Sequence, residues 1–175
     1  MNITIRLGME DDIDELEQLY NNLNDHLAAT TNYPGWKKGV YPIRKDAEAG
    51  INKGCLYVAL SGNKMVGSMI LRHEPEPAYL SVTWMKDLKY EEVFVIYTFV
   101  VHPDYLGQGI GSELLHFASK LGSKLNLKSL RLDVYEYNVP AIRLYEKCGF
   151  HYIATVDIGL SEYNLNWFKL YEKLL

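Results

Sequence analysis

The sequence predicts an α/β fold, which some schemes class as α+β, in a single domain of residues 1–175. Three observations support this prediction. Short β-prone apolar runs recur along the chain, longer segments carry apolar residues at helical spacing, and one strand, helix and strand follow each other as a βαβ unit. Apolar residues make up 48% of the sequence and charged residues 23%, which is the composition of a globular protein.

The first third of the chain predicts a strand, a long helix, a loop and a second helix. Residues 3–7 alternate between apolar and polar, as in a strand, and apolar residues recur at helical spacing over residues 13–28. Proline and glycine interrupt any periodicity over residues 30–41, so we expect a loop there. A second helix is predicted over residues 42–52, because proline is well tolerated at the first helical position.

A hairpin, a connector and a buried strand are predicted next. Residues 56–60 and 65–71 are apolar and β-prone, and the Ser-Gly-Asn-Lys sequence that joins them is typical of a hairpin. Residues 72–92 form a long connector with an exposed Trp84, and such a length indicates a functional segment or an oligomer contact. Residues 93–101 are almost wholly apolar, which predicts the central strand, buried on both faces.

The C-terminal part predicts the parallel pair of the sheet. Apolar residues keep helical spacing over residues 110–121, and residues 130–134 read as a strand. With residues 93–101 they make one βαβ unit, whose crossover should be right-handed. The other predicted elements are a helix over residues 139–148, a strand over residues 150–156 and a tail over residues 167–175 whose period fits either helix or strand.

Charge and hydropathy restrict the partners that we expect. The net charge is −4 and the lysines form no cluster, which argues against a nucleic acid partner. No apolar run reaches the ~18 residues of a membrane span, and residues 1–6 lack the pattern of a signal peptide, so we expect a cytoplasmic protein with no membrane partner. Cys55 and Cys148 are expected to be free thiols, and we expect no metal.

A glycine-rich loop follows the central strand and opens the next helix. It contains Gly107, Gly109 and Gly111; glycine allows sharp turns, and the first N–H groups of a helix lack acceptors and attract anions such as pyrophosphate. A Walker loop would need Gly-Lys-Ser/Thr where this chain has Gly111, Ser112 and Glu113, and a dinucleotide fingerprint would need glycine at Ser112. A turn that only caps the helix is the remaining alternative.

Two segments resemble the signatures of the GNAT superfamily of N-acetyltransferases. Residues 99–111, Phe-Val-Val-His-Pro-Asp-Tyr-Leu-Gly-Gln-Gly-Ile-Gly, are similar to its acetyl-CoA signature. Residues 138–150, Asn-Val-Pro-Ala-Ile-Arg-Leu-Tyr-Glu-Lys-Cys-Gly-Phe, resemble its second signature, at the usual distance downstream. The resemblance implies a GNAT fold, a central mixed and mostly antiparallel twisted sheet of about seven strands with one parallel βαβ pair, flanked by about four helices.

The resemblance also implies acetyl-CoA as co-substrate and assigns residues to its binding. Main-chain N–H groups of residues 99–101 would contact the thioester carbonyl, and the glycine loop would hold the pyrophosphate. Leu106 stands where the signature usually has Gln or Arg, which removes a side-chain contact but leaves the backbone donors. The residues assigned to acetyl-CoA are Phe99, Val100, Val101, Leu106, Gly107, Gln108, Gly109, Ile110, Gly111, Ser112, Asn138 and Ala141.

Two further residues receive catalytic roles from the resemblance. Tyr145 fits the general acid, because a phenol with a pKa of ~10 stays protonated at neutral pH; its alternative role is to cover the core. Asp133 resembles the proton acceptor of the ribosomal-protein N-terminal acetyltransferases. A lysine-like amine with a pKa of ~10.4 is neutral only about once in 10³ at pH 7, so such an acceptor is needed. The alternatives are an Asp133 paired with Arg131 or Arg143, and a base supplied by Glu91, Glu92 or a water chain.

The resemblance also implies that the acceptor binds at the loop of residues 30–41, because the superfamily places acceptor-binding segments between its first two helices. Tyr33, Trp36 and Tyr41, with two neighbouring lysines, could hold a small amine that also carries a carboxylate or phosphate; alternatively, Trp36 only packs and the lysines are solvated.

The sequence therefore predicts an enzyme that transfers the acetyl group of acetyl-CoA to a primary amine of a small molecule or peptide by direct attack. A non-catalytic module that senses acetyl-CoA or CoA is the alternative, which Leu106 favours. A structural protein without a CoA site would leave both signatures unexplained. The long connector and the aromatic tail are compatible with a homodimer.

Overall fold

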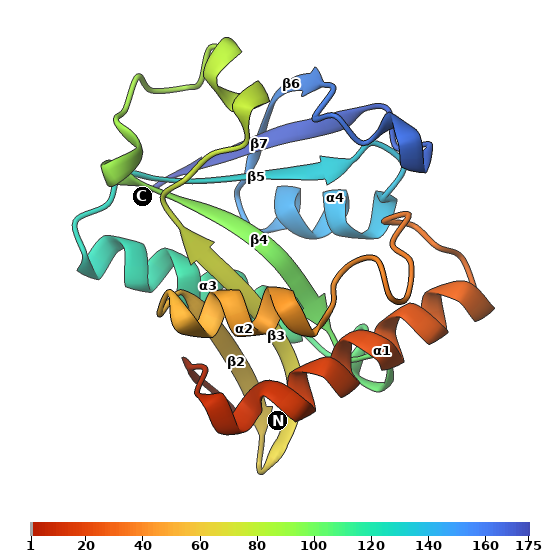
Figure 1. Cartoon of the computed structure of the whole chain (residues 1–175). Helices are drawn as coiled ribbons and strands as arrows, with labels where there is room; N and C mark the ends of the chain where they lie inside the picture. Colours follow the sequence, from red (N-terminus) through yellow and green to blue (C-terminus); the bar gives the residue numbers. More distant parts are fainter. Residues whose placement is uncertain (1) are drawn as a thin grey trace. The chain divides into compact units, whose positions relative to one another are not determined.

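The protein has a mixed sheet with helices, as the sequence predicts. The structure is a computed structural model that describes residues 2–175, so Met1 lies outside it. Within these residues seven strands are linked in the order β1-β2-β3-β4-β5-β7-β6, and four α-helices accompany them (Figure 1). β4 and β5 form the predicted parallel pair, while β1 with β2, β2 with β3, β5 with β7 and β6 with β7 are antiparallel. The predicted fold class is confirmed.

The chain divides into two compact units, which are described separately. The first unit comprises the residues up to Asn32 together with Trp36–Leu71 and Tyr97–Phe117, and the second comprises Tyr33–Gly35, Arg72–Ile96 and Ala118–Leu175. β4 (Val93–Val101) and α3 (Ile110–Lys124) each contribute residues to both units. The extent of a single domain over residues 1–175 stays a prediction.

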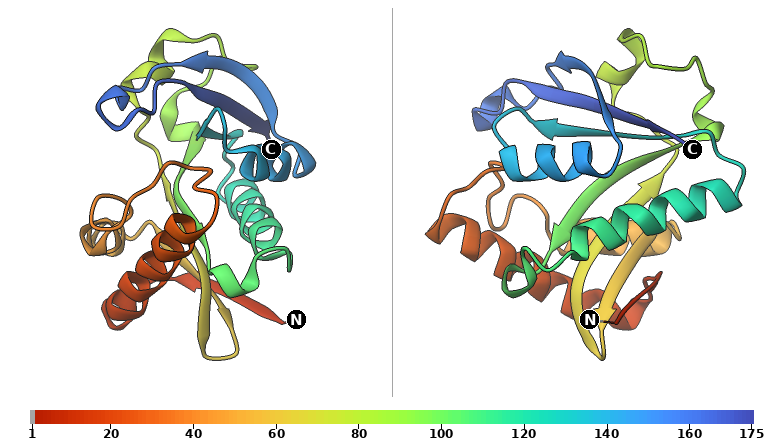
Figure 2. Two further views of the ribbon diagram at one scale, coloured as in Figure 1. Left: turned by 90° about the vertical axis from the view of Figure 1, so that its right-hand side faces the viewer. Right: turned by 180° about the vertical axis from the view of Figure 1, so that it is seen from behind.

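The first unit is a small sheet between helices. Its elements are β1 (Ile3–Leu7), α1 (Ile13–Ala29), α2 (Arg44–Asn52), β2 (Leu56–Ser61) and most of β3 (Lys64–Arg72). α1 and α2 cover one face of β1 to β3, and the first half of α3 covers the other face (Figure 2). α1 is helical because its apolar residues recur every three or four positions and can all be buried; they are Leu16, Leu19, Tyr20, Leu23 and Leu27.

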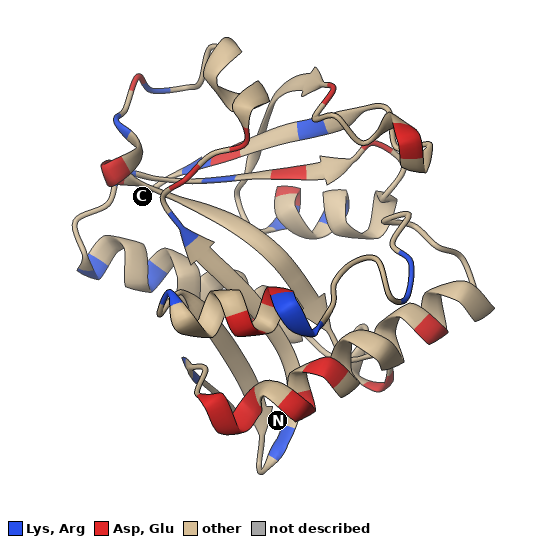
Figure 3. Ribbon diagram, in the orientation of Figure 1, with Lys and Arg blue, Asp and Glu red and all other residues tan. Residues whose placement is uncertain are grey.

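Ion pairs on the surface join the two helices of this face. Arg44 at the start of α2 contacts Asp14 at 2.7 Å and Glu17 at 2.9 Å, both on α1, and Glu48 one turn further along α2 at 2.9 Å. Figure 3 shows the basic start of α2 beside the acidic residues of α1. Exposed pairs of this kind contribute little stability each, about 0–1 kcal/mol.

The second helix begins at Arg44, whereas the sequence predicts a start at Pro42. Ile43 is still extended, with φ −132° and ψ 169°, and its N–H donates to the Asp46 carboxylate at 2.8 Å. An acidic side chain at the third helical position thus binds the residue before the helix and fixes where the helix begins. This interaction outweighs the preference of proline for the first position.

The second unit is built on the C-terminal strands. Its elements are the first half of β4, the end of α3, β5 (Ser129–Tyr135), α4 (Val139–Lys147), β6 (His151–Val156) and β7 (Phe168–Leu174). The ambiguous tail is therefore a strand, and it pairs along its whole length with β5. The parallel ladder joins Val93–Val95 of β4 to Ser129–Arg131 of β5, and β4 continues for six more residues.

No helix of residues 2–175 combines the length and the apolar character that crossing a bilayer requires.

Candidate active site

The glycine loop lies in the first unit, directly after β4, and is braced by its own side chains. His102 is buried and accepts a hydrogen bond at Nδ1 from the Asp104 N–H at 3.2 Å, which caps the short helix of residues 103–105. The Gln108 amide donates to the Asp104 carbonyl at 2.8 Å. Burial and the nearby charge of Lys64 lower the pKa of His102, so its ring remains neutral and able to accept. These contacts within the loop hold its backbone in the observed shape.

The backbone donors of the loop divide into two groups. The N–H of Leu106 donates to the Pro103 carbonyl at 3.2 Å, and that of Gln108 donates to the Tyr105 carbonyl at 3.3 Å. The N–H groups without an acceptor among residues 2–175 are those of Gly107, Gly109, Ile110, Gly111 and Ser112. These are the donors that a helix start offers to an anion.

The fit of the loop to a pyrophosphate rests on its backbone shape. Gly107 and Gly109 have φ of +74° and +87°, a region that residues with a side chain adopt only at a cost. Their side of the loop is open, since a Cβ built on either residue meets nothing within 4 Å. Leu106 is 50% exposed and offers no polar side-chain contact. The unpaired amides, the glycine conformations and the open surface fit a diphosphate group.

The last residues of β4 also belong to the first unit and contain a strained residue. Thr98 has φ +46°, which is rare for a β-branched residue and costs about 1–3 kcal/mol. Its Oγ1 lies 2.8 Å from the hydroxyl of Tyr41 in the predicted acceptor loop. Phe99, Val100 and Val101, the residues assigned to the thioester, come directly after this irregular point.

The predicted acceptor loop is held by a contact within its aromatic segment and by contacts with α1. Trp36 contacts the Tyr41 ring edge-on, with ring centroids 5.2 Å apart. The buried Asn24 of α1 donates to the Tyr41 carbonyl at 3.2 Å, and Lys38 pairs with Asp25 at 2.7 Å. Lys38 is thus paired on the surface. Tyr33 belongs to the second unit, where it is 41% exposed.

Asp133 lies on β5 in the second unit, and its partner is a tyrosine. The Tyr79 hydroxyl donates to Asp133 Oδ2 at 2.7 Å. Within residues 2–175 this is the one hydrogen bond of the carboxylate, and it forms no ion pair with Arg131 or Arg143. Pairing with one of these arginines was the structural alternative for Asp133, and the structure shows another arrangement.

The surroundings of Asp133 make its carboxylate more basic. Burial raises the pKa of Asp133 from its ordinary 3.8 to about 6; the hydrogen bond from Tyr79 opposes this increase, and the charge of Glu76 adds to it. The residue as a whole is half-buried. A carboxylate with a pKa near 6 is ionised at neutral pH and accepts a proton more readily than an ordinary aspartate.

Tyr145 lies on the opposite face of this part of the sheet. Its ring packs against Phe150 and Tyr171, with centroids 5.9 and 6.5 Å away, and it is 6% exposed. Tyr171 stands opposite Leu132 in the β5–β7 register, and successive side chains of a strand point to opposite faces. Asp133 therefore points away from the face that Tyr145 covers.

Asn138 and Ala141, both assigned to acetyl-CoA, form the start of α4. Asn138 is the N-cap, and its Oδ1 accepts from the Ala141 N–H at 3.4 Å. This contact gives the asparagine a local structural role in the helix that carries Tyr145. Its contact with acetyl-CoA stays a prediction.

Glu91 and Glu92, the alternative bases, lie in a short helix before β4. The Glu92 carboxylate accepts from the Lys89 N–H at 3.3 Å, and the Glu92 carbonyl accepts from Lys128 at 2.8 Å. Glu91 is exposed. Glu92 thus has a capping role.

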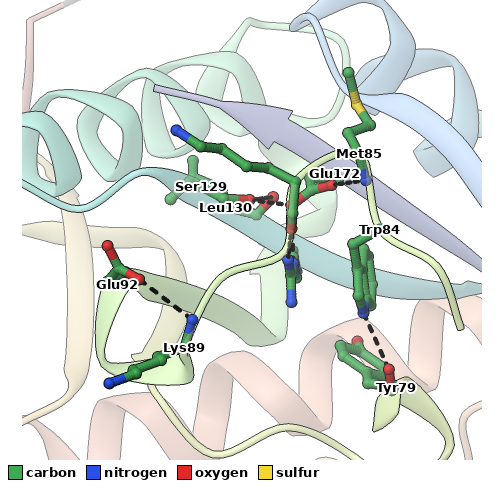
Figure 4. A network of polar contacts seen from close by, with 10 residues as sticks. Tyr79, Trp84, Met85, Lys89, Glu92, Ser129, Leu130 and Glu172 are labelled. Atoms are coloured by element: carbon green, nitrogen blue, oxygen red, sulfur yellow. Dashed lines mark hydrogen bonds and ion pairs between the residues drawn. The ribbon is translucent and has the colours of Figure 1, made fainter. Parts of the chain in front are cut away.

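A buried network in the second unit holds the long connector. Arg131 is 1% exposed; its Nε donates to Glu172 at 2.9 Å and its terminal nitrogen donates to the Lys86 carbonyl at 2.9 Å. Glu172 also accepts from Ser129 and from the Met85 N–H, each at 2.7 Å (Figure 4). These bonds fasten the connector to β5 and β7.

Trp84 is half-buried, which corrects the expectation that it is exposed. Its ring packs against Tyr79 with ring centroids 5.3 Å apart, and its Nε1 donates to the Tyr79 carbonyl at 3.0 Å (Figure 4). The Arg131 guanidinium lies over the Trp84 ring, 4.2 Å from its centroid. The reason is the buried arginine, which attracts an aromatic face.

Removing the charge of Glu172 should destabilise the protein strongly. In Glu172→Gln the Arg131 cation stays buried without its counter-ion, which costs about 3–5 kcal/mol of unfolding free energy. Urea unfolding measures this loss. Glu48→Gln, which breaks an exposed pair with Arg44, should cost less than about 1 kcal/mol. Similar losses for the two variants would contradict the role of the network.

Two residues of the connector between β3 and β4 contribute to the site and were not predicted from the sequence. Tyr79 and Glu76 influence Asp133 from 54 and 57 positions earlier in the chain. The only signal for them was the unusual length of the connector. Neither Cys55 nor Cys148 forms a disulfide bond, which agrees with the prediction.

The sheet order and the loop define a protein of the GNAT fold class, and comparisons with known proteins agree. The chain aligns over 99% of its length with a GNAT acetyltransferase structure from Streptococcus agalactiae, with a TM-score of 0.80, 20% identity and 95% of that chain covered. It aligns equally over 99% with the ribosomal-protein-S18-alanine N-acetyltransferase of Escherichia coli, with a TM-score of 0.69, 16% identity and 94% coverage.

Sequence comparison gives the family itself. The model of the acetyltransferase (GNAT) family matches residues 16–150, so the chain belongs to the GNAT acetyltransferase family, whose co-substrate is acetyl-CoA. A streptothricin acetyltransferase of Escherichia coli is 30% identical over 117 residues, which cover 65% of this chain and 58% of that protein. An uncharacterised N-acetyltransferase of Methanocaldococcus jannaschii is 26% identical over 153 residues, 84% of this chain and 60% of that protein. The matches thus span about three fifths of these relatives.

Proposed function

We propose that the chain is an N-acetyltransferase that transfers the acetyl group of acetyl-CoA to a primary amine of a small molecule or a peptide by direct attack. Family membership supports acetyl transfer in general. The observation that carries the catalytic proposal is Asp133, a carboxylate whose pKa is raised to about 6. A module that only senses CoA has no use for such a group.

The loop of the first unit provides the binding function. We assign the unpaired N–H groups of Gly109, Ile110, Gly111 and Ser112 to the pyrophosphate of acetyl-CoA, because each is a donor at a helix start. The contacts of Phe99, Val100 and Val101 with the thioester, and of Asn138 with acetyl-CoA, are part of this proposal. Acetyl-CoA supplies the acetyl group in activated form, as a thioester.

The chain's own groups then carry the protons. Asp133 takes a proton from the acceptor ammonium group, so that the neutral amine can form the new bond to the carbonyl carbon. Main-chain N–H groups of residues 99–101 donate to the carbonyl oxygen, which gains negative charge during the attack. When the bond between carbon and sulfur breaks, Tyr145 donates its phenolic proton to the thiolate. The attacking nitrogen, positively charged after the attack, loses its second proton to solvent to give the amide, and the Tyr145 phenolate takes a proton back from solvent.

Thiol release tests the proposal. The purified protein is mixed with acetyl-CoA and a panel of polyamines, amino acids, streptothricin and peptides with free N-termini, and free CoA thiol is measured. We expect release above background with at least one amine. Saturable CoA binding without release for any amine would leave the sensing module in place of the enzyme.

Replacing the proposed acid should slow turnover without affecting binding. In Tyr145→Phe we expect kcat to fall about 10- to 100-fold, below the full range for acid catalysis, because a thiol of pKa ~8.5 is already a good leaving group. The Kd for CoA, measured by calorimetry, should change less than about twofold. Tyr152→Phe, which changes a half-exposed tyrosine of the same unit, is the matched control. An unchanged kcat in Tyr145→Phe would remove this residue from the mechanism.

A further inference from the structure

We propose that Tyr79 is a positioning residue for Asp133, which holds the carboxylate by one oxygen and directs the other toward the proton of the acceptor amine. This inference rests on the proposed function, because it concerns the carboxylate that we assign as base. Tyr79 belongs to neither GNAT signature and lies in the connector between β3 and β4.

The contact itself is short and specific. The Tyr79 hydroxyl donates to Asp133 Oδ2 at 2.7 Å, a strong hydrogen bond between a phenol and a carboxylate. Oδ1 makes no hydrogen bond within residues 2–175, and the carboxylate has no ion pair in that part of the chain that would rotate it. One oxygen is therefore occupied and the other can accept a proton.

Tyr79 is itself held in place. It is 1% exposed, its ring packs against Trp84, and its carbonyl accepts from the Trp84 indole at 3.0 Å. Trp84 in turn lies under the Arg131 guanidinium, which Glu172 holds from β7. Arg131 and Asp133 are two positions apart on β5 and so lie on one face of the strand. The same arginine thus orders the connector that carries Tyr79 and lies beside the carboxylate that Tyr79 binds.

The hydrogen bond also decides when the carboxylate is ionised. A donor stabilises the charged form, whereas burial and the charge of Glu76 favour the protonated form. Without the Tyr79 hydroxyl only the opposing effects remain. A larger share of Asp133 would then be protonated, and unable to act as a base, at neutral pH.

The test is Tyr79→Phe, which removes the hydroxyl and keeps the ring against Trp84. The Asp133 carboxyl is titrated by ¹³C NMR without substrate, and kcat/KM is measured between pH 5 and pH 9. We expect the midpoint to move upward by about one pH unit, the size of effect that one charged hydrogen bond gives. Near pH 6 kcat/KM should fall several-fold and near pH 9 it should recover to within about threefold, with the KM for acetyl-CoA unchanged.

Two controls make the result decisive. Tyr163→Phe changes an exposed tyrosine of the same unit and should leave the titration and the rate unchanged. In Asp133→Asn the further change Tyr79→Phe should not lower kcat/KM again, because a residue that acts through Asp133 has no separate effect. An unmoved NMR midpoint, an equal loss at every pH, or additive losses in the double variant would each overturn the proposal.

The NMR titration also separates this inference from the proposed function. If the midpoint moves while Asp133→Asn keeps full activity, the hydrogen bond to the carboxylate is established and the assignment of Asp133 as the base fails. If Asp133→Asn is inactive and the midpoint does not move, the base assignment stands and the role of Tyr79 is overturned.

Discussion

Asp133→Asn is expected to lower kcat/KM by about 10²- to 10⁴-fold, the usual contribution of a general base. Asparagine keeps the shape of the side chain and an oxygen that can accept from Tyr79, but it cannot take a proton from the amine. In the wild-type protein kcat/KM should rise with pH through a midpoint of about 6, the pKa of Asp133. An alkyl amine titrates near ~10.4, so its own effect on the rate is well separated. The pH profile of kcat/KM at steady state, recorded for both proteins, measures the loss in Asp133→Asn and shows whether the limb near pH 6 is absent from that variant.

The stability of the variant separates a catalytic loss from unfolding. Because the folded pKa of Asp133 is raised above its ordinary 3.8, the folded state binds more protons between that value and about 6. This group therefore favours the folded state at low pH, and the contribution is lost as the pH rises through about 6. Above pH 7 the ionised carboxylate is a cost to folding, so Asp133→Asn should have an equal or higher Tm there.

Glu91→Gln and Glu92→Gln are the matched controls, because these carboxylates are the other candidate bases. We expect either variant to keep the lower limb of the profile at about pH 6. If Glu91→Gln or Glu92→Gln removed the limb while Asp133→Asn kept it, the base would lie before β4 and not on β5. A limb that persisted in all three variants would show that the group that titrates near pH 6 is none of these three carboxylates.

The fold was accessible from the sequence because its signals are local. The apolar run of β4, the helical spacing of α1 and α3 and the glycines between β4 and α3 each lie within one short window. Tyr145 lies in the second signature, on the helix that is α4, and Asp133 lies on the predicted strand before that signature, which is β5. The C-terminal tail could not be decided from its period, and its pairing with β5 shows that a distant strand fixed its conformation.

The surroundings of the candidate base were not accessible in this way. Tyr79 reaches Asp133 across 54 positions of the chain, and Trp84 is covered because Arg131 lies over it. Neither contact follows from periodicity, since both depend on how the connector packs on β5. Two differences from the sequence-based expectations therefore have one physical origin. Trp84 is half-buried instead of exposed, and Asp133 binds a tyrosine instead of an arginine. Arg131 forms its ion pair with Glu172, so the Asp133 carboxylate accepts its hydrogen bond from Tyr79 instead.

Gly109→Ala should abolish most of the affinity for CoA. Gly109 has φ +87°, and an alanine there must either accept this conformation at a cost of about 1–2 kcal/mol or turn the peptide and redirect the neighbouring N–H groups. Each charged hydrogen bond to phosphate contributes about 1.5–3 kcal/mol. Losing one of them raises the Kd roughly 10- to 150-fold. Isothermal titration with CoA and with acetyl-CoA measures the change.

Gly54→Ala is the matched control for this loop, because it reproduces the strain without touching the candidate donors. Gly54 has φ +63°, and, as at Gly109, a Cβ there meets nothing within 4 Å. Both variants should therefore lose a similar free energy of unfolding, about 1 kcal/mol, while only Gly109→Ala loses CoA binding. Equal CoA affinity in the two variants would show that the amides at the start of α3 do not bind the pyrophosphate. The enzyme and the sensing module would both be excluded only if the wild-type protein bound neither CoA nor acetyl-CoA.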